Sequence, residues 1–261
     1  WLGKYFDNTC AGKPNPNGSI AIGNKSPLAL HGKTQKAVNF ETEELFRWAG
    51  GEVDRSLEKS YDSINRKETL GTSDKDSQLD FLLRTSLDAQ VSSDRIRAAV
   101  SKQPLVSYPD GKLAQQLQLI ASMIRADLPT RVYYASLGGF DTHANQLNSH
   151  ANLMRQLGGA LNAFQKDLGK QRNTGKVMTM VFSEFGRRVA QNGSAGTDHG
   201  TAAPMLLIGD NVQTGLLGDH PSLSNLDEGD LKFNTDFREV YAAILEDWMG
   251  ADSMAVLGKK F

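Results

Sequence analysis

The sequence has very little of the residue type that builds disulfide-bonded proteins, zinc fingers and thiol enzymes. Cys10 is the only cysteine in 261 residues, which excludes an internal disulfide and any metal site made of several cysteines. Cys10 lies in a stretch rich in Gly, Pro and Asn that has no histidine nearby in sequence. We therefore interpret Cys10 as an incidental thiol.

Long apolar runs and an excess of one charge are also missing. No apolar run approaches the roughly 20 residues of a membrane-spanning helix. The formal net charge is −1, with both signs interspersed, whereas a nucleic-acid or acidic-membrane partner would need a sizeable basic patch. The sequence contains neither a Gly-x-Gly-x-x-Gly motif after a strand nor a Gly-x-Ser-x-Gly motif. We therefore expect no transmembrane segment, no nucleic-acid partner, no dinucleotide and no serine-hydrolase elbow.

The composition that remains is that of an ordinary globular protein, with 39% hydrophobic and 23% charged residues. In the first 40 residues, Ser19–Ile22 and Pro27–Leu30 read as short strands. The chain then becomes charged and poor in glycine, and apolar residues recur with helical periodicity over 74–89 and over Lys112–Ala126. The sequence therefore predicts a helical region over 41–128.

From residue 129 onward, strand-like and helix-like segments alternate. Arg131–Leu137, Lys176–Phe182 and Pro204–Ile208 read as buried strands because they are rich in apolar, β-branched and aromatic residues. Gln146–Leu168 and Phe237–Met249 read as amphipathic helices. This order is typical of a parallel sheet with helices on its faces.

Polar segments flanked by glycine adjoin each of these three strands. GGFDTH follows the first strand, SEFGRR follows the second, and GTDHG shortly precedes the third. Ligands of open α/β sheets bind at the carboxyl ends of strands, and neighbouring strands lie only ~4.8 Å apart. Asp and His together suit Zn²⁺ or Mn²⁺ better than Ca²⁺. We therefore predict a divalent-metal site whose ligands come from Asp141, His143, Glu184, Asp198 and His199.

Each of these residues taken alone has a simpler explanation. Asp141 could cap the helix that follows it. His143 could be a surface histidine, and Glu184 a solvated loop charge. Arg187 could be ordinary surface charge, or could hold an anionic substrate in a bidentate grip. The joint occurrence of such residues beside three strands favours the site of a metal-dependent hydrolase.

The order of these motifs resembles the DUF1501 family of bacterial proteins, many of which are exported. The likeness spans the whole chain, including the opening WLGKYFD and the closing DFREVYAAILEDWMG. The family in turn resembles the alkaline phosphatase and sulfatase superfamily. The resemblance implies an α/β fold, an alkaline-phosphatase-like three-layer sandwich with a mostly parallel sheet. It implies a single domain over 1–261, with its helical region at 41–128 and its sheet and metal site at 129–261, in a periplasmic or exported protein.

Comparison with the superfamily by chain order assigns roles to the candidates. Asp141 and His143 fill the first ligand position, and the pair Asp198–His199 fills the last. Glu184 stands where the superfamily has the Asp of an Asp-His pair, and Phe185 stands in place of that His. The loss of this nitrogen ligand favours one metal, or a site richer in carboxylates, over two zinc ions.

The resemblance also implies that the superfamily nucleophile and a further Asp ligand lie upstream of Trp1. We therefore expect this chain to be the C-terminal portion of a longer protein. Two functions are consistent with these observations. The first is a metal-dependent hydrolase of small phosphate or sulfate esters in which Arg187 contacts the anionic ester. The alternative is a non-catalytic exported binding or assembly protein that retains the scaffold.

Overall fold

The structure is a computed structural model that describes residues 1–10, 15, 17–34, 36–41, 54 and 93–261. The chain divides into two compact units. The first comprises 1–103 and 122–135, and the second comprises 104–121 and 136–261. The helix expected over 74–89 lies outside the described residues.

A three-stranded parallel sheet forms the core of the first unit, in the order β2-β1-β3. Its strands are β1 (Ser19–Ile22), β2 (Val38–Phe40) and β3 (Val132–Ala135). Strand β1 lies in the middle, and all four of its residues are buried. The strands expected at Ser19–Ile22 and within Arg131–Leu137 are therefore confirmed, and the chain is a mixed α/β protein.

The short strand expected at Pro27–Leu30 is wrong. Leu28–Leu30 forms a single turn of 3₁₀ helix, η1, which buries Leu30 and leaves Leu28 82% exposed. An apolar run of this length fits either state, and Pro27, which donates no backbone N–H, suits the start of a turn. A helix that the sequence did not predict, α1 (Leu2–Thr9), packs closely on this region. A Cβ on Gly3 would lie 2.1 Å from the carbonyl carbon of His31, so only glycine permits this approach.

Two of the helices predicted from apolar periodicity lie in the described residues of this region, and both are confirmed. They are α5 (Lys112–Arg125) and α6 (Gln146–Gln171). The C-terminal half of α6 buries residues such as Phe164 and Leu168, whereas Leu147 in its first turn is 83% exposed. None of the helices in the part of the chain that the structure describes, α6 included, is long and apolar enough to span a membrane.

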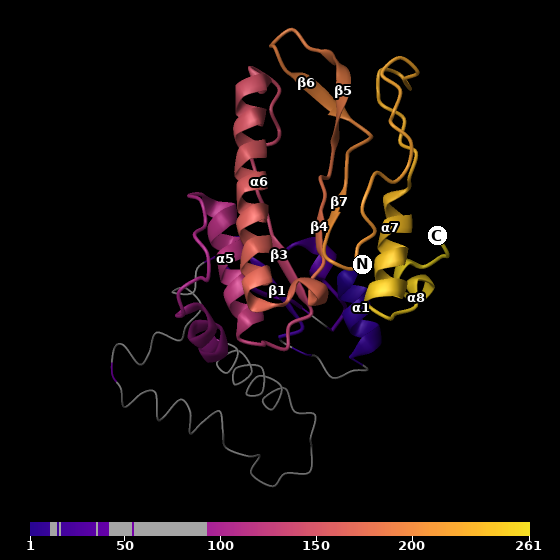
Figure 1. Ribbon diagram of the computed structural model, residues 1–261. Coiled ribbons are helices and arrows are strands. Elements are labelled where there is room, and N and C mark those ends of the chain that lie inside the picture. Colours follow the sequence, from indigo (N-terminus) through magenta and orange to yellow (C-terminus); the bar gives the residue numbers. More distant parts are fainter. Residues whose placement is uncertain (11–14, 16, 35, 42–53, 55–92) are drawn as a thin grey trace. The chain divides into compact units, whose positions relative to one another are not determined.

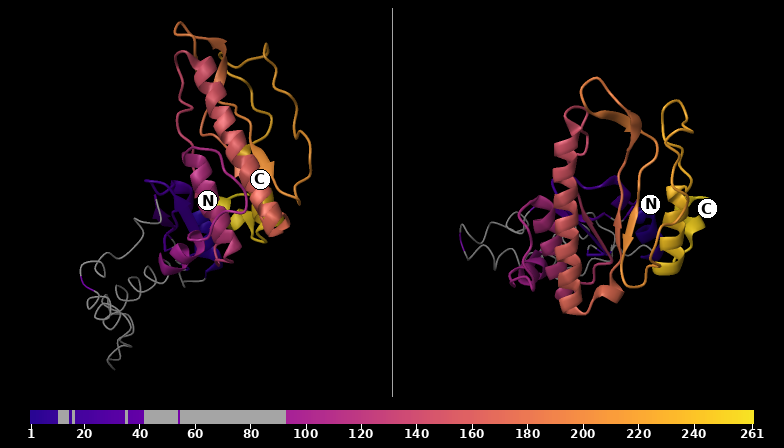
Figure 2. Two further views of the ribbon diagram at one scale, coloured as in Figure 1. Left: turned by 60° about the vertical axis from the view of Figure 1, so that its left-hand side comes forward. Right: turned by 45° about the horizontal axis from the view of Figure 1, so that its top comes forward.

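The second unit contains a long antiparallel excursion of the chain. The chain runs outward through β4 (Thr179–Val181) and β5 (Gly186–Gln191), turns, and returns through β6 (Thr197–Gly200) and β7 (Leu206–Ile208). Strand β4 pairs with β7 and β5 pairs with β6, both antiparallel. Figures 1 and 2 show the β5–β6 ribbon beyond the end of the β4–β7 pair, near the start of α6.

This arrangement corrects the expectation that the strands at Lys176–Phe182 and Pro204–Ile208 lie in one parallel sheet with Arg131–Leu137. A parallel pair needs a crossover of a dozen or more residues, usually a helix. The segment between β4 and β7 is instead folded as the β5–β6 ribbon, which reverses the chain. The polar motifs SEFGRR and GTDHG therefore extend into strands of their own.

The second unit ends in three short helices, α7 (Phe237–Ala243), the π-helical turn η3 (Ile244–Trp248) and α8 (Ser253–Leu257). The Asp236 carboxylate accepts a hydrogen bond from the backbone N–H of Arg238, which caps α7. The helix predicted over Phe237–Met249 is therefore confirmed, with a π-helical last turn.

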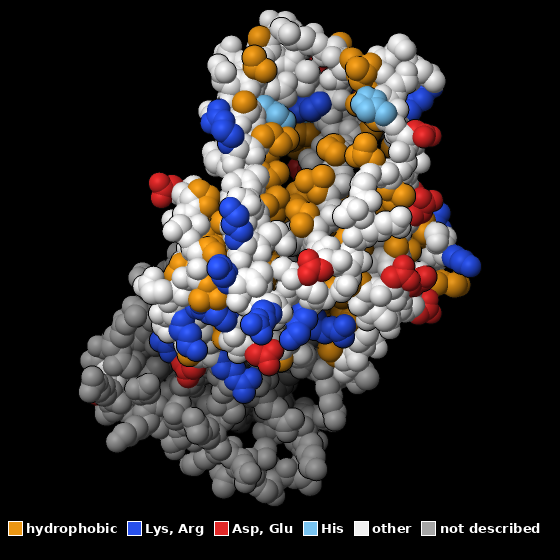
Figure 3. Space-filling view, viewed as in Figure 1, with side chains coloured by type: hydrophobic (Ala, Val, Ile, Leu, Met, Phe, Trp, Pro, Cys, Tyr) orange, Lys and Arg blue, Asp and Glu red, His pale blue; other side chains and the backbone are white. Residues whose placement is uncertain are grey.

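Apolar side chains lie exposed on this unit beside its polar ribbon. Figure 3 shows hydrophobic side chains gathered between α6 and the strands of the second unit. The exposed apolar residues of these elements and of the segments beside them include Leu147, Met154, Phe182, Val189 and Leu206.

Candidate metal centre

The turn between β5 and β6 is shaped by Asn192. Its side-chain Oδ1 accepts hydrogen bonds from the backbone N–H groups of Ser194 (2.9 Å) and Gly196 (3.1 Å). Its Nδ2 donates to the backbone carbonyl of His143 at 3.0 Å. Gly196 lies against the same carbonyl, because a Cβ built there would be 2.3 Å from the His143 oxygen. The turn is therefore fastened to the loop that carries His143.

The N-terminus of α6 is held by the same turn. The backbone N–H groups of Asn145 and Gln146 donate to the carbonyls of Ser194 and Ala195, each at 3.0 Å. Asn145 is the N-cap residue, and it adopts a left-handed conformation with φ 45°. Backbone carbonyls thus satisfy amide groups that a helix start leaves without partners. Asp141 does not cap α6; its carboxylate contacts His143 and His199 instead.

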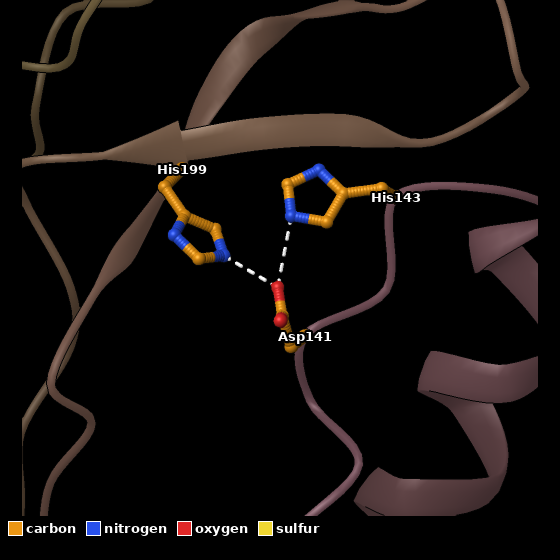
Figure 4. Close-up of side chains that lie close together, drawn as sticks. All are labelled: Asp141, His143 and His199. Carbon is orange, nitrogen blue, oxygen red and sulfur yellow. Dashed lines mark hydrogen bonds and ion pairs between the residues drawn. The ribbon is translucent and has the colours of Figure 1, made fainter.

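Asp141 lies between two histidines (Figure 4). Its Oδ1 is 2.6 Å from Nε2 of His199 and 2.8 Å from Nε2 of His143. The two imidazole rings are 4.8 Å apart between centroids. One ligand atom from each residue can be chosen so that all three lie within 4.8 Å of one another. The side chains are 64%, 46% and 45% exposed for Asp141, His143 and His199, so the cluster is open to solvent.

A further carboxylate lies on the opposite edge of the His143 ring. Asp198 Oδ1 is 3.4 Å from Nδ1 of His143, and it accepts a hydrogen bond from Asn192 Nδ2 at 3.2 Å. His143 is thus placed between two acidic groups, one at each ring nitrogen. A carboxylate at Nδ1 is the usual means of orienting a histidine that presents Nε2 to a metal.

Hydrogen bonds keep both carboxylates ionised. The bond from His199, with a smaller contribution from His143, holds the pKa of Asp141 below its usual value. For Asp198, the bond from Asn192 is the largest cause of a lowered pKa, and His143 adds to it. Each carboxylate therefore carries a full negative charge at neutral pH, the form that can bind a cation.

An aromatic ring and a guanidinium are stacked behind His199. The ring of Phe185 lies flat against the His199 ring, with centroids 4.0 Å apart and an interplanar angle of 14°. The guanidinium carbon of Arg187 is 5.2 Å from the centroid of Phe185. Arg187 also donates hydrogen bonds to the carbonyls of Phe140 and Thr197 and to the hydroxyl of Thr142. These contacts connect the His199 ring, the residues on either side of Asp141 and strand β6.

The model of the family described as "Protein of unknown function (DUF1501)" matches residues 1–256, which include every residue of this cluster. The chain belongs to the DUF1501 family. No curated protein and no solved structure matches it significantly.

The DUF1501 chain brings together four of the five residues that the sequence singled out. Asp141, His143 and His199 converge, and Asp198 lies beside His143. Glu184 is exposed and does not belong to the group of described residues close enough to share an ion. Its role as a ligand, and that of Asp198, stay predictions.

The way these residues converge differs from the expectation. They come from the loop after β3 and from β6 of the antiparallel ribbon, rather than from the ends of three neighbouring parallel strands. Sequence reasoning also missed Asn192 and took Phe185 only as the absence of a ligand. The dipeptide Asn192-Gly193 is a recognised signal for a tight turn between strands, and could have placed the ribbon.

Proposed function

We propose that this DUF1501 protein is a metal-dependent hydrolase of small phosphate or sulfate esters, and that Asp141, His143 and His199 hold a single Zn²⁺ or Mn²⁺ ion. The convergence of these three side chains carries the proposal. The proposal includes an alkaline-phosphatase-like sandwich as the fold of the protein, and an exported or periplasmic location. Both rest on the family resemblance.

The donor set fits such an ion. Two imidazoles and one carboxylate form a common catalytic set, because three protein ligands leave a coordination position open for substrate or water. Metal–ligand bonds of ~2.1 Å in a tetrahedron place donor atoms about 3.4 Å apart. The present separations from Asp141 Oδ1 are 2.6 Å and 2.8 Å, which are hydrogen-bond lengths. Binding therefore requires the donors to move apart by roughly 0.6–0.8 Å, which exposed side chains can do.

A bound divalent ion would supply Lewis-acid polarisation of an ester oxygen. The chain's own residues prepare the site for it. Nε2 of His143 donates to Asp141, and Asp198 lies at Nδ1, where it can hold the ring proton when a metal takes the place of the proton on Nε2. Asn192 fixes Asp198 and the His143 backbone together. The contact between Arg187 and an anionic ester stays a prediction, because the described contacts of Arg187 are to groups of the protein.

The position of Phe185 favours the second candidate function, a non-catalytic exported binding or assembly protein. Its ring is packed against His199, where it offers no ligand atom. A site with fewer ligands than the superfamily pattern can bind a cation or a partner without catalysing hydrolysis.

Titration of the purified 261-residue chain with Zn²⁺ and with Mn²⁺, followed calorimetrically, tests the proposal. We expect one ion per chain, and loss of binding in Asp141→Ala and His199→Ala. His220→Ala is the matched control, because the described contact of this exposed loop histidine is to the Pro221 carbonyl. Absence of binding by the wild type would refute the metal site. Binding without turnover of any phosphate or sulfate ester would favour the non-catalytic function.

A further inference from the structure

Arg187 occupies a special position in the ribbon, because it lies directly opposite His199. The register of the antiparallel pair β5–β6 places Arg187 across from His199 and Gly186 across from Gly200. Directly opposite residues in an antiparallel pair project on the same face of the sheet. The side chain of Arg187 is therefore directed to the face that carries the His199 imidazole.

The guanidinium of Arg187 connects two segments of the chain around the cluster. Its Nη2 donates to the carbonyl of Phe140 and, at 3.3 Å, to the hydroxyl of Thr142. These are the two neighbours of Asp141 in sequence. Its Nη1 donates at 2.6 Å to the carbonyl of Thr197 in β6. One side chain thus fixes the segment on each side of Asp141 relative to the strand that carries His199.

A second contact links Arg187 to the His199 ring itself. Phe185 lies between them, with its ring flat on His199 and its centroid 5.2 Å from the Arg187 guanidinium carbon. A cation over an aromatic face is attracted by the negative face of the ring. The stack Arg187–Phe185–His199 therefore restrains the rotation of the imidazole that presents Nε2 to Asp141.

We propose that Arg187 is the positioning residue of the metal centre. It fixes the separation of Asp141 and His199 through its bonds to Phe140 and Thr197, and it fixes the His199 ring through Phe185. This inference rests on the proposed metal site, and it assigns Arg187 a task different from contact with an anionic ester. The neighbouring Arg188 pairs its Nε with Asp230 at 3.0 Å, and its charge makes only the smallest of the contributions that lower the pKa of Asp198.

The geometry requires arginine rather than a positive charge in general. The guanidinium is a rigid planar fork whose terminal nitrogens donate in fixed directions, here to acceptors on two separate segments. A lysine ammonium is a single point of attachment on a flexible stem. It can retain the charge over Phe185, but it cannot hold both carbonyls in one geometry.

The test compares Zn²⁺ affinity in Arg187→Gln, Arg187→Lys and the matched control Arg188→Gln, measured by competition with a chromogenic chelator. We expect all to bind one ion. Loss of a partner that orients metal ligands typically weakens metal affinity by roughly 10–100-fold, and we expect this for both Arg187 variants. Arg188→Gln should stay within about threefold of the wild type, because the Asp230 pair lies outside the cluster. Wild-type affinity in Arg187→Gln, or its restoration by lysine, would overturn the proposal.

A readout without metal separates this inference from the proposed function. The face of an aromatic ring shifts the NMR signals of protons stacked on it, so the His199 ring protons report the contact with Phe185. We expect these signals to move toward those of an unstacked histidine in Arg187→Gln and to stay in place in Arg188→Gln. Unchanged His199 signals in Arg187→Gln would contradict the positioning role even if the wild type bound no metal.

Phe185→Leu provides a second variant should Arg187→Gln fail to fold, as judged by far-UV circular dichroism. It keeps the three hydrogen bonds of Arg187 and removes the ring between Arg187 and His199. We expect one bound Zn²⁺ with affinity lowered by about tenfold, the smaller end of the range for orienting partners. Wild-type affinity in Phe185→Leu would show that the stack does not orient His199.

Discussion

Replacing Gly196 by alanine should disrupt the metal centre without changing any proposed ligand. A Cβ at this position would lie 2.3 Å from the backbone oxygen of His143 and 2.4 Å from its carbonyl carbon. Both obstructing atoms belong to the backbone, so rotation of a side chain cannot relieve the clash. The ribbon and the loop that carries His143 must move apart.

The size of the movement follows from the contact distance. Ordinary contacts of a Cβ begin near 3.4 Å, so the two segments must separate by about 1 Å. Metal–ligand distances tolerate only ~0.2 Å, and the hydrogen bond from Asn192 to the His143 carbonyl would also be stretched. We expect Zn²⁺ affinity to fall by at least the roughly 10–100-fold that follows loss of an orienting partner. Forcing an extra methyl group into a close contact also costs typically ~1–3 kcal/mol of stability.

Gly193→Ala in the same turn is the matched control, because no atom lies within 4 Å of a Cβ built at Gly193. Chelator competition would give the Zn²⁺ dissociation constant of both variants, and urea unfolding would give their free energies of unfolding. Equal affinities in the two variants would refute the inferred packing of Gly196 on His143. A loss of stability with unchanged affinity would show that the packing exists but does not hold the ligands.

Three further outcomes follow from individual side chains. Leu168 is 0% exposed, so Leu168→Ala should lower the free energy of unfolding by about 2–5 kcal/mol in urea titrations, whereas Leu147→Ala (83% exposed) should change it by less than about 0.5. Because the pKa of Asp141 is lowered from 3.8, its ionised form stabilises the fold at pH values above 3.8. This stabilisation is lost as the pH falls through the lower pKa of the folded protein. In His199→Ala, the NMR titration midpoint of Asp141 should therefore rise toward 3.8. Burial raises the pKa of the Tyr133 phenol to about 12. The stability that its neutral form contributes is therefore complete below pH ~10 and is lost as pH rises toward 12. Phenolate absorbance should report this pKa, and Tyr133→Phe should remove this part of the pH dependence of stability.

The long helices could be predicted because their signal repeats over many turns. Apolar periodicity over Lys112–Ala126 and Gln146–Leu168 matches α5 and α6 closely. Short elements carry no such repetition. The apolar run at Pro27–Leu30 fits a strand as well as the 3₁₀ turn that it forms, and α1 begins after Trp1 with no side-chain cap to mark it.

The pairing of the C-terminal strands could not be deduced from their apolar content. Three apolar segments separated by a helix and a polar stretch satisfy the pattern of a parallel sheet. The deciding feature is the polar stretch, which forms strands β5 and β6 and reverses at Asn192. Exposed strands of this kind contain mostly polar residues and lack the apolar alternation by which strands are recognised.

Three residues of the candidate metal centre were nonetheless predictable, because their selection depends on chemistry more than on topology. Asp141, His143 and His199 were selected as residue types that bind Zn²⁺ or Mn²⁺, and they converge although the predicted parallel pairing of the C-terminal strands is wrong. The residues that orient them could not be selected in this way. They act through the side-chain amide of Asn192, the ring face of Phe185 and the guanidinium N–H groups of Arg187. Residues of these three types have many other roles in proteins, so their presence in a sequence does not indicate a metal site.

The hydrogen bonds within the cluster suggest how the site is kept ready for a cation. Asp141 is the shared acceptor for both histidines, and this holds the three side chains together. A metal would replace these two hydrogen bonds and therefore compete with protons on the imidazoles. The lowered pKa values of Asp141 and Asp198 keep both carboxylates ionised well below neutral pH. The same acidic groups that attract the cation thus also fix the rings that bind it, so Asp141→Asn should weaken metal binding through both effects at once.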